Sequence, residues 1–155
     1  MNSASKIVPL EKLLAWRRKC GRSGVKVVFT NGCFDIIHAG HVRLLEKAGS
    51  LGGALVVGLN SDKSVRRLKG AGRPVNPQKD RALVLAGLSA VDRVAVFGED
   101  TPFELLRELR PDILVKGADY RVSAIVGREF AGKVVRVKLV KGRSTSGTIE
   151  KLRAI

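Results

Sequence analysis

The chain has 155 residues, of which 45% are hydrophobic and 28% are charged. This composition is typical of one globular domain, and no apolar stretch approaches the roughly 20 residues that span a bilayer. The net charge of +15 favours anionic ligands such as nucleic acid or phosphorylated small molecules. The N-terminus lacks a signal peptide's apolar core, and Cys20 and Cys33 suggest neither a disulfide framework nor a metal site. We therefore expect a cytoplasmic protein with reduced thiols and no membrane partner.

Helical and strand-like patterns alternate along the chain. Apolar spacing predicts a first helix over residues 10–20, and short β-branched runs predict buried strands. After that helix, the predicted elements are a strand at 25–30, a helix at 40–51, a strand at 54–60, a helix at 77–88, a strand at 92–97, a helix at 101–109, a strand at 112–117, a strand at 133–140 and a helix at 144–155.

The connecting segments carry weaker signals. Residues 61–77 are polar and marked by Gly and Pro, so we expect mostly loop with at most a short helical turn. Thr101 is the predicted N-cap of its helix, with Pro102 in the first turn, and Ser144 or Thr145 is the predicted cap of the last helix. No element is assigned to residues 120–127.

This alternation predicts an α/β fold: a Rossmann-like, doubly wound, five-stranded parallel sheet with helices on both faces. We expect a single domain over 1–155, with an N-terminal helical extension at 1–24 and the core at 25–155. Ligands of such sheets bind beyond the carboxyl ends of the strands, where the strand order reverses. Segments after each strand, rich in Gly, Lys, Arg, Asp or hydroxyl groups, are expected to converge there.

The segment "TNGCFDIIHAGH", residues 30–41, contains both histidines of the chain. Gly32 allows a close turn after the strand, and a helix beginning near His38 places His38 and His41 on one face. Two imidazoles at a helix N-terminus can donate hydrogen bonds to phosphate, and Gly40 leaves space between them. Asp35 is a candidate to orient a ring, hold a phosphate-bound Mg²⁺ or cap the helix. Histidines without a function, or a metal site of Asp35, His38 and His41, are the alternatives.

The same residues show a family resemblance. "TNGCFD" followed by "HAGH" resembles the HxGH signature of the nucleotidyltransferase superfamily, the cytidylyltransferase-like proteins. "NSD", "RPVNP", "KGADY" and "STS" follow in the family's order, so the resemblance covers nearly all of the chain from residue 30. This order is most similar to the bacterial D-glycero-D-manno-heptose 1-phosphate adenylyltransferase domains, the ADP-heptose synthases of lipopolysaccharide precursor synthesis.

The resemblance implies transfer of AMP from ATP to a sugar 1-phosphate, with Mg²⁺ accompanying ATP and no organic cofactor. It assigns catalysis to His38, His41, Lys69 and Arg81. It assigns nucleotide binding to the two histidines and to Thr30, Asn31, Gly32, Phe34, Gly40, Lys116, Gly117, Ser144 and Thr145. It assigns sugar-phosphate binding to Asp35, Asn60, Asp62, Arg73, Asp119 and Tyr120. Asp62 is equally a helix-cap candidate, Asp119 suits either a sugar hydroxyl or a nucleobase, and Ser144 and Thr145 also suit plain N-capping.

Other functions are weighed against this one. A cytidylyltransferase for glycerol 3-phosphate or a similar phospho-alcohol is the main alternative, but that family usually has "DDW" where "ADY" occurs here. A basic nucleic-acid-binding module is a distant one, because only 5% of residues are aromatic and the basic residues are dispersed. An inactive scaffold would not need this set of polar residues. The resemblance also implies a homodimer.

Overall fold

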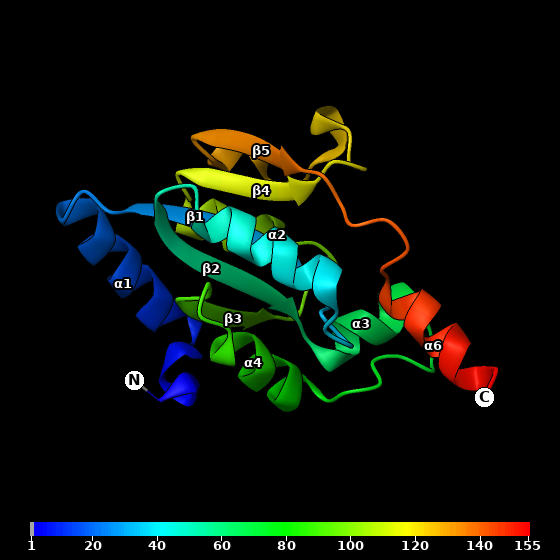
Figure 1. Ribbon diagram of the computed structural model, residues 1–155. Coiled ribbons are helices and arrows are strands. Elements are labelled where there is room, and N and C mark those ends of the chain that lie inside the picture. Colours follow the sequence, from blue (N-terminus) through cyan, green and yellow to red (C-terminus); the bar gives the residue numbers. More distant parts are fainter. Residues whose placement is uncertain (1) are drawn as a thin grey trace.

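The computed structural model describes residues 2–155 and contains one five-stranded sheet (Figure 1). The strands are β1 (Lys26–Gly32), β2 (Gly53–Asn60), β3 (Arg93–Phe97), β4 (Ile113–Gly117) and β5 (Lys133–Val137). They lie in the order β3-β2-β1-β4-β5, and every pairing is parallel. The chain winds outward from β1 to β3 and then returns to place β4 beside β1. The predicted fold is therefore confirmed, and the order reverses between β1 and β4.

Helices cover both faces of the sheet (Figure 1). On one face, α2 (Ala39–Gly49) and α4 (Gln78–Gly87) pack through side chains such as Leu45 and Leu85, which are fully buried. On the other face, α1 (Leu10–Arg22) and α5 (Phe103–Leu109) pack through Leu13 and Leu106. These two apolar layers make β1, β2 and β4 hydrophobic on both sides, which is the pattern of a central parallel strand.

Residues 61–77 differ from the expected loop, because they include the eight-residue helix α3 (Asp62–Lys69). The side chain of Ser61 accepts a hydrogen bond from the Ser64 amide and caps this helix. Gly70 ends it, with a φ of 99° that favours glycine. With Val65 as its one fully buried apolar residue, α3 lacks the repeated apolar positions from which the other helices were predicted.

Three further details differ from the sequence-based expectations. Pro102, and not Thr101, precedes α5 as the N-cap residue. Strand β5 ends at Val137, three residues earlier than expected. Residues 122–124 and 128–130 form short 3₁₀ helices in the stretch left partly unassigned.

The last helix, α6 (Thr145–Arg153), lies beyond the carboxyl ends of the strands, near α3 (Figure 1). Ser144 is its N-cap and accepts a hydrogen bond from the Gly147 amide, as one of the two expected caps. No residue of α6 is fully buried, so the helix is held mainly through its first turn. Within residues 2–155, no helix has the length and apolarity needed to cross a membrane.

Candidate active site

A cavity of about 670 Å³ opens at the carboxyl edge of the sheet, where β1 and β4 diverge. This volume is within the range of small-molecule sites. Each of the five strands contributes lining residues from the segment that follows it, represented by His38, Lys69, Thr101, Asp119 and Ser144. The convergence predicted from the sequence is confirmed, because parallel strands deliver their following loops to one edge.

His38 and His41 are packed against each other at the start of α2. Their ring centroids are 3.8 Å apart and their planes differ by 24°, and both rings line the cavity. His38 is the N-cap of α2, and its Nδ1 accepts a hydrogen bond from the Gly40 amide at 3.1 Å. The centroid of the Phe34 ring lies 5.0 Å from the centroid of the His41 ring, and the two planes are tilted by 57°.

Both imidazoles are neutral near pH 7. Burial, followed by the charge of Arg143, lowers the pKa of His38, and burial with the neighbouring His38 lowers the pKa of His41 to about 4. Because Nδ1 of His38 accepts a hydrogen bond, its proton is on Nε2. Nδ1 of His41 is buried without a partner, which also favours the proton on Nε2. The pair therefore offers two neutral N–H donors.

Two glycines of this turn have roles that differ from those expected. A Cβ on Gly40 would lie 2.8 Å from the His38 ring, so this glycine makes room for the histidine and not for a ligand between the two rings. A Cβ on Gly32 would lie 3.0 Å from the Phe34 ring. The left-handed turn after β1 is at Phe34, whose φ is 45°, and not at Gly32.

Cationic and hydroxyl-bearing side chains surround the histidines. Lys69, at the end of α3, and Arg73, in the loop after it, line the cavity on one side. Ser144 and Thr145 line it at the N-terminus of α6, whose backbone N–H groups favour an anion. The Thr145 hydroxyl also donates to the Ile36 carbonyl at 3.3 Å, which links α6 to the histidine turn.

Lys116, near the end of β4, is a buried residue of the cavity lining. Its ammonium donates to the Asn31 side-chain oxygen and lies 5.2 Å from the centre of the Tyr120 ring. Burial lowers the pKa of Lys116 to about 8, against the opposite effect of Asp119. Asp119 and Tyr120 line the cavity beside it. A charge at this depth is suited to contact an anionic or polar ligand group.

The lowered pKa of Lys116 leads to a prediction about the pH dependence of the free energy of unfolding. The unfolded chain keeps a lysine proton up to about pH 10.4, whereas folded Lys116 loses it near pH 8. The free energy of unfolding contributed by Lys116 should therefore rise with pH between about 8 and 10.4. Urea denaturation at pH 7.5 and pH 9.5 measures this, and Lys116→Met should lack the increase that Lys12→Met, at an exposed position, retains. An identical increase in all three proteins would contradict the prediction.

Four residues expected in the site do not line the cavity: Thr30, Asp62, Arg81 and Gly117. Thr30 is buried and donates its hydroxyl to the Val115 carbonyl at 3.0 Å, which ties β1 to β4. A Cβ on Gly117 would lie 2.5 Å from the Asp119 carboxylate and 2.9 Å from Leu139, so Gly117 accommodates these side chains. Asp62 does not cap α3, since Ser61 does, and its carboxylate instead accepts from Arg81 at 2.8 Å.

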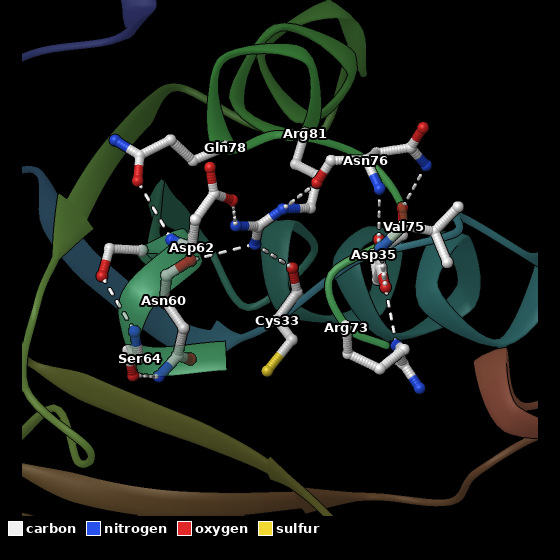
Figure 2. A network of polar contacts seen from close by, with 11 residues as sticks. Cys33, Asp35, Asn60, Asp62, Ser64, Arg73, Val75, Asn76, Gln78 and Arg81 are labelled. Carbon is white, nitrogen blue, oxygen red and sulfur yellow. Dashed lines mark hydrogen bonds and ion pairs between the residues drawn. The ribbon is translucent and has the colours of Figure 1, made fainter. Parts of the chain in front are cut away.

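Arg81 is among the most buried large side chains, 2% exposed. Its guanidinium donates to three carbonyl oxygens and one carboxylate, and Arg81 is not among the residues that line the cavity (Figure 2). Asn60, whose carbonyl is one of these acceptors, does line the cavity, and its side-chain amide donates to Ser64 at 3.0 Å. The structure therefore does not bring Arg81 to the phosphate-binding position that the resemblance implies.

Asp35 neither orients a histidine ring nor caps the helix, and a contact of its carboxylate with a phosphate-bound Mg²⁺ stays a prediction. Its carboxylate makes no hydrogen bond to a histidine, and His38 caps α2 in its place. It accepts hydrogen bonds from Arg73, Val75 and Asn76. Among residues 2–155, no three His, Cys, Asp or Glu side chains are grouped to hold a metal ion.

The sequence reasoning missed several lining residues. Arg143 lies at the edge of the cavity, near Gly40 and His38, and its position just before the Ser144 cap was the available signal. Side chains Ile125, Val126, Leu139 and Val140 form an apolar part of the wall. Ile125 and Val126 come from a stretch without a predicted element, and Leu139 and Val140 come from the end of the predicted strand at 133–140, which lies beyond β5, so nothing in the sequence indicated that they meet.

Paired imidazoles beside separate cations, on a parallel sheet with a reversal in strand order, define a site for the phosphates of a nucleotide. A sequence profile of the cytidylyltransferase-like family matches residues 29–153, and the protein belongs to this family. The match confirms the resemblance seen in the motifs and the expectation of a nucleotidyltransferase.

Individual relatives agree with this assignment. The chain is 56% identical over 138 residues to the bifunctional protein HldE of Wolinella succinogenes, a match covering 89% of this chain and 28% of that protein. It is 55% identical over 148 residues to HldE of Helicobacter pylori, covering 96% and 31%, and 60% identical over 144 residues to HldE of Mesorhizobium japonicum, covering 90% and 28%. The chain thus spans less than a third of the length of these relatives.

Solved structures show the same fold. A lipopolysaccharide core biosynthesis protein from Thermoplasma volcanium superposes with a TM-score of 0.63 at 26% identity, over 76% of this chain and all of that one. A pantoate-β-alanine ligase from Francisella tularensis superposes with a TM-score of 0.61 over 95% of this chain and 78% of its own. Its 15% identity makes it evidence of fold alone.

Proposed function

We propose that this chain transfers AMP from ATP to heptose 1-phosphate, forming an ADP-sugar and releasing pyrophosphate. The observation that carries the proposal is the stacked His38–His41 pair, which offers two neutral N–H donors to the same cavity as Lys69, Arg73 and the start of α6. The similarity to HldE proteins and the order of the sequence motifs support the choice of an adenylyl group and a heptose phosphate.

The chemistry needs positioning and charge stabilisation more than acid–base catalysis. An oxygen of the sugar phosphate attacks the α-phosphorus of ATP, a new P–O bond forms, and the bond to the pyrophosphate group breaks. Because the attacking phosphate is already anionic, no residue has to remove a proton from it. The histidine N–H groups and the nearby cations then stabilise the negative charge that develops on the oxygens around phosphorus.

The cavity offers separate surroundings for the parts of such substrates. The apolar wall, which includes Ile125 and Leu139, suits the faces of a nucleobase, while Lys116 and Asp119 beside it offer polar contacts. Lys69 and Arg73, on the side of β2 and α3, suit the acceptor phosphate. In this arrangement the two phosphates would meet in front of the histidine pair.

Mg²⁺ is expected to enter with ATP. Of the carboxylates in the cavity lining, Asp35 is paired with Arg73 and Asp100 with Arg67, which leaves Asp119. One carboxylate is too few ligands for a resident ion but is compatible with Mg²⁺ held by the triphosphate, the usual mode for this ion. The metal would neutralise phosphate charge, and the residues of this chain would orient the phosphates.

Pyrophosphate release, measured over a matrix of substrates, tests the proposal. ATP, CTP, GTP and UTP are each combined with heptose 1-phosphate, glycerol 3-phosphate and phosphoethanolamine in the presence of Mg²⁺. We expect release with ATP and heptose 1-phosphate to exceed every other pair by at least about tenfold, the scale of one lost specific contact. Preferred turnover of CTP with glycerol 3-phosphate would favour the cytidylyltransferase alternative, and no release with any pair would reject nucleotidyl transfer to these acceptors.

The resemblance also supports a homodimer and a cytoplasmic location, and both stay predictions. Analytical ultracentrifugation of the chain determines the first directly. A sedimentation coefficient of a monomer at assay concentration would rule out a dimer as the active form.

A further inference from the structure

The loop of residues 70–77, between α3 and α4, borders the cavity through one side chain. It contributes Arg73, and it directly follows Lys69 at the end of α3. The loop contains no helix or strand, so its conformation depends on side chains that bind its backbone. Two buried charged residues, Asp35 and Arg81, make these bonds (Figure 2).

Asp35 binds the loop from the histidine turn. Its side chain is fully buried, and its carboxylate accepts hydrogen bonds from Arg73 Nε at 2.7 Å, from the Val75 amide at 2.8 Å and from the Asn76 amide at 2.9 Å. The Asn76 side-chain amide donates in turn to the Asp35 carbonyl at 2.7 Å. Burial alone would raise the pKa of Asp35, but these hydrogen bonds outweigh it and lower the pKa. The carboxylate is therefore ionised at neutral pH.

Arg81 binds the same loop from α4. Its Nε donates to the Asn76 carbonyl at 3.0 Å, and its Nη1 donates to the carbonyls of Cys33 and Asn60 at 2.6 and 2.9 Å. Its Nη2 pairs with Asp62 at 2.8 Å. A single side chain thus connects the end of β2, the turn after β1 and the loop.

Asn76 is where the two sets of contacts meet. Its amide and side chain bind Asp35, and its carbonyl binds Arg81. Both Asp35 oxygens and all three Arg81 nitrogens are used by the protein, which leaves neither group placed to hold a substrate. Arg73 differs, because only its Nε is bound to the protein within residues 2–155, so its two terminal nitrogens are available to an anion in the cavity.

We propose that Asp35 and Arg81 are positioning residues, which contact no substrate and act by fixing the 70–77 loop so that Arg73 presents its terminal nitrogens to the acceptor phosphate. The proposal rests on the function proposed above for its last step, the phosphate contact. It replaces a direct phosphate contact by Arg81, because this guanidinium is buried, lines no part of the cavity and donates four of its five N–H groups to three carbonyls and one carboxylate.

Hydrogen–deuterium exchange of the ligand-free chain tests the anchoring without any substrate. Asp35→Asn keeps the shape of the side chain but removes its charge and the acceptor for Arg73. Arg81→Lys keeps the charge but can replace only part of the four contacts. In both variants we expect amides of peptides covering residues 70–77 to exchange at least about tenfold faster than in the unmodified chain. A residue that only binds phosphate would leave this exchange unchanged.

Asp112→Asn is the matched control. The Asp112 carboxylate also accepts from a backbone amide, that of Val27 at 2.7 Å, and from an arginine, Arg17 at 3.2 Å. It lies at the opposite, amino end of the sheet, just before β4. This variant should leave both the exchange of residues 70–77 and the rate of pyrophosphate release unchanged.

A double-mutant cycle in kcat/KM tests whether Asp35 acts through Arg73. We expect Asp35→Asn to lower kcat/KM for ATP and heptose 1-phosphate by about 10- to 100-fold, the cost of a misplaced binding group. In a chain that already has Arg73→Ala, the same change should cost less than about threefold, because the group that Asp35 positions is gone. Losses that multiply in full would show that Asp35 acts independently and would overturn the proposal.

A milder variant keeps the test decisive if the charge changes prevent folding. Asn76→Ala removes only the bond from its side chain to the Asp35 carbonyl and leaves every buried charge paired. Faster exchange confined to residues 70–77 supports the proposal when kcat/KM falls with it, and overturns the proposal when kcat/KM is unchanged, because the order of the loop would then not set the position of Arg73. An absence of turnover with every substrate pair would instead overturn the proposed function, since the exchange measurement needs no substrate.

Discussion

Replacing His41 by alanine is expected to lower kcat by about 100-fold or more while the protein stays folded. This is the scale of removing one donor that stabilises transition-state charge. The ring lies against His38 and Phe34 at the cavity, and its neutral Nε2–H is the group that an alanine loses. Single-turnover measurement of pyrophosphate release with saturating ATP isolates this step from substrate binding.

Two amide variants separate the donor from the bulk of the ring. Glutamine can place its N–H₂ close to the position of Nε2, whereas asparagine places it nearer Nδ1, which is buried and unpartnered. His41→Gln should therefore retain more activity than His41→Asn, which should resemble His41→Ala. Near-normal turnover of His41→Ala would contradict the catalytic role, and equal activity of the two amide variants would contradict the assignment of the proton to Nε2.

Replacing Arg81 by alanine is expected to destabilise the fold by about 3–5 kcal/mol, as when one partner of a buried ion pair is removed. Arg81 is 2% exposed, and the loss of its guanidinium leaves Asp62 and three carbonyl oxygens without their donor. These acceptors belong to β2, the turn after β1 and the 70–77 loop, so the damage is not local. Urea denaturation followed by circular dichroism gives the change in the free energy of unfolding.

Arg67→Ala is the corresponding exposed case. Arg67 also pairs with a carboxylate, Asp100 at 2.7 Å, but both side chains are about half exposed, at 49% and 55%. Its removal should cost less than about 1 kcal/mol, as for most surface ion pairs. Similar losses for the two variants would show that burial does not set the importance of Arg81.

The two arginines of the 73–81 region show how far motif reading extends. The motif order correctly placed Arg73 at the cavity, because "RPVNP" belongs to the segment that follows β2. The same reading placed Arg81 among the catalytic residues, and only its four hydrogen bonds reveal a different position. A sequence lists an arginine's neighbours along the chain but not the carbonyls from three other segments that surround it.

Asp35 and the glycines of the histidine turn make the same point. Their residue types indicated a tight, polar turn, which the structure contains. Their partners were not predictable, since Asp35 binds a loop about 40 residues further along and Gly40 accommodates the His38 ring. Helix α3 was missed for a related reason, because its stability depends on Ser61 and on one buried valine more than on a repeated apolar pattern.

The sequence by itself determined the alternation of strands and helices, the parallel sheet and the histidine pair at a helix start, because these depend on local apolar periodicity and short motifs. Only the tertiary structure decided which charged residues face the cavity and which hold its walls. Burial is the physical reason. A charged side chain that is buried has its hydrogen-bonding groups paired within the protein, whereas a side chain with unpaired donors at the cavity is available to a ligand. Asp35 and Arg81 belong to the first kind, and Arg73 to the second.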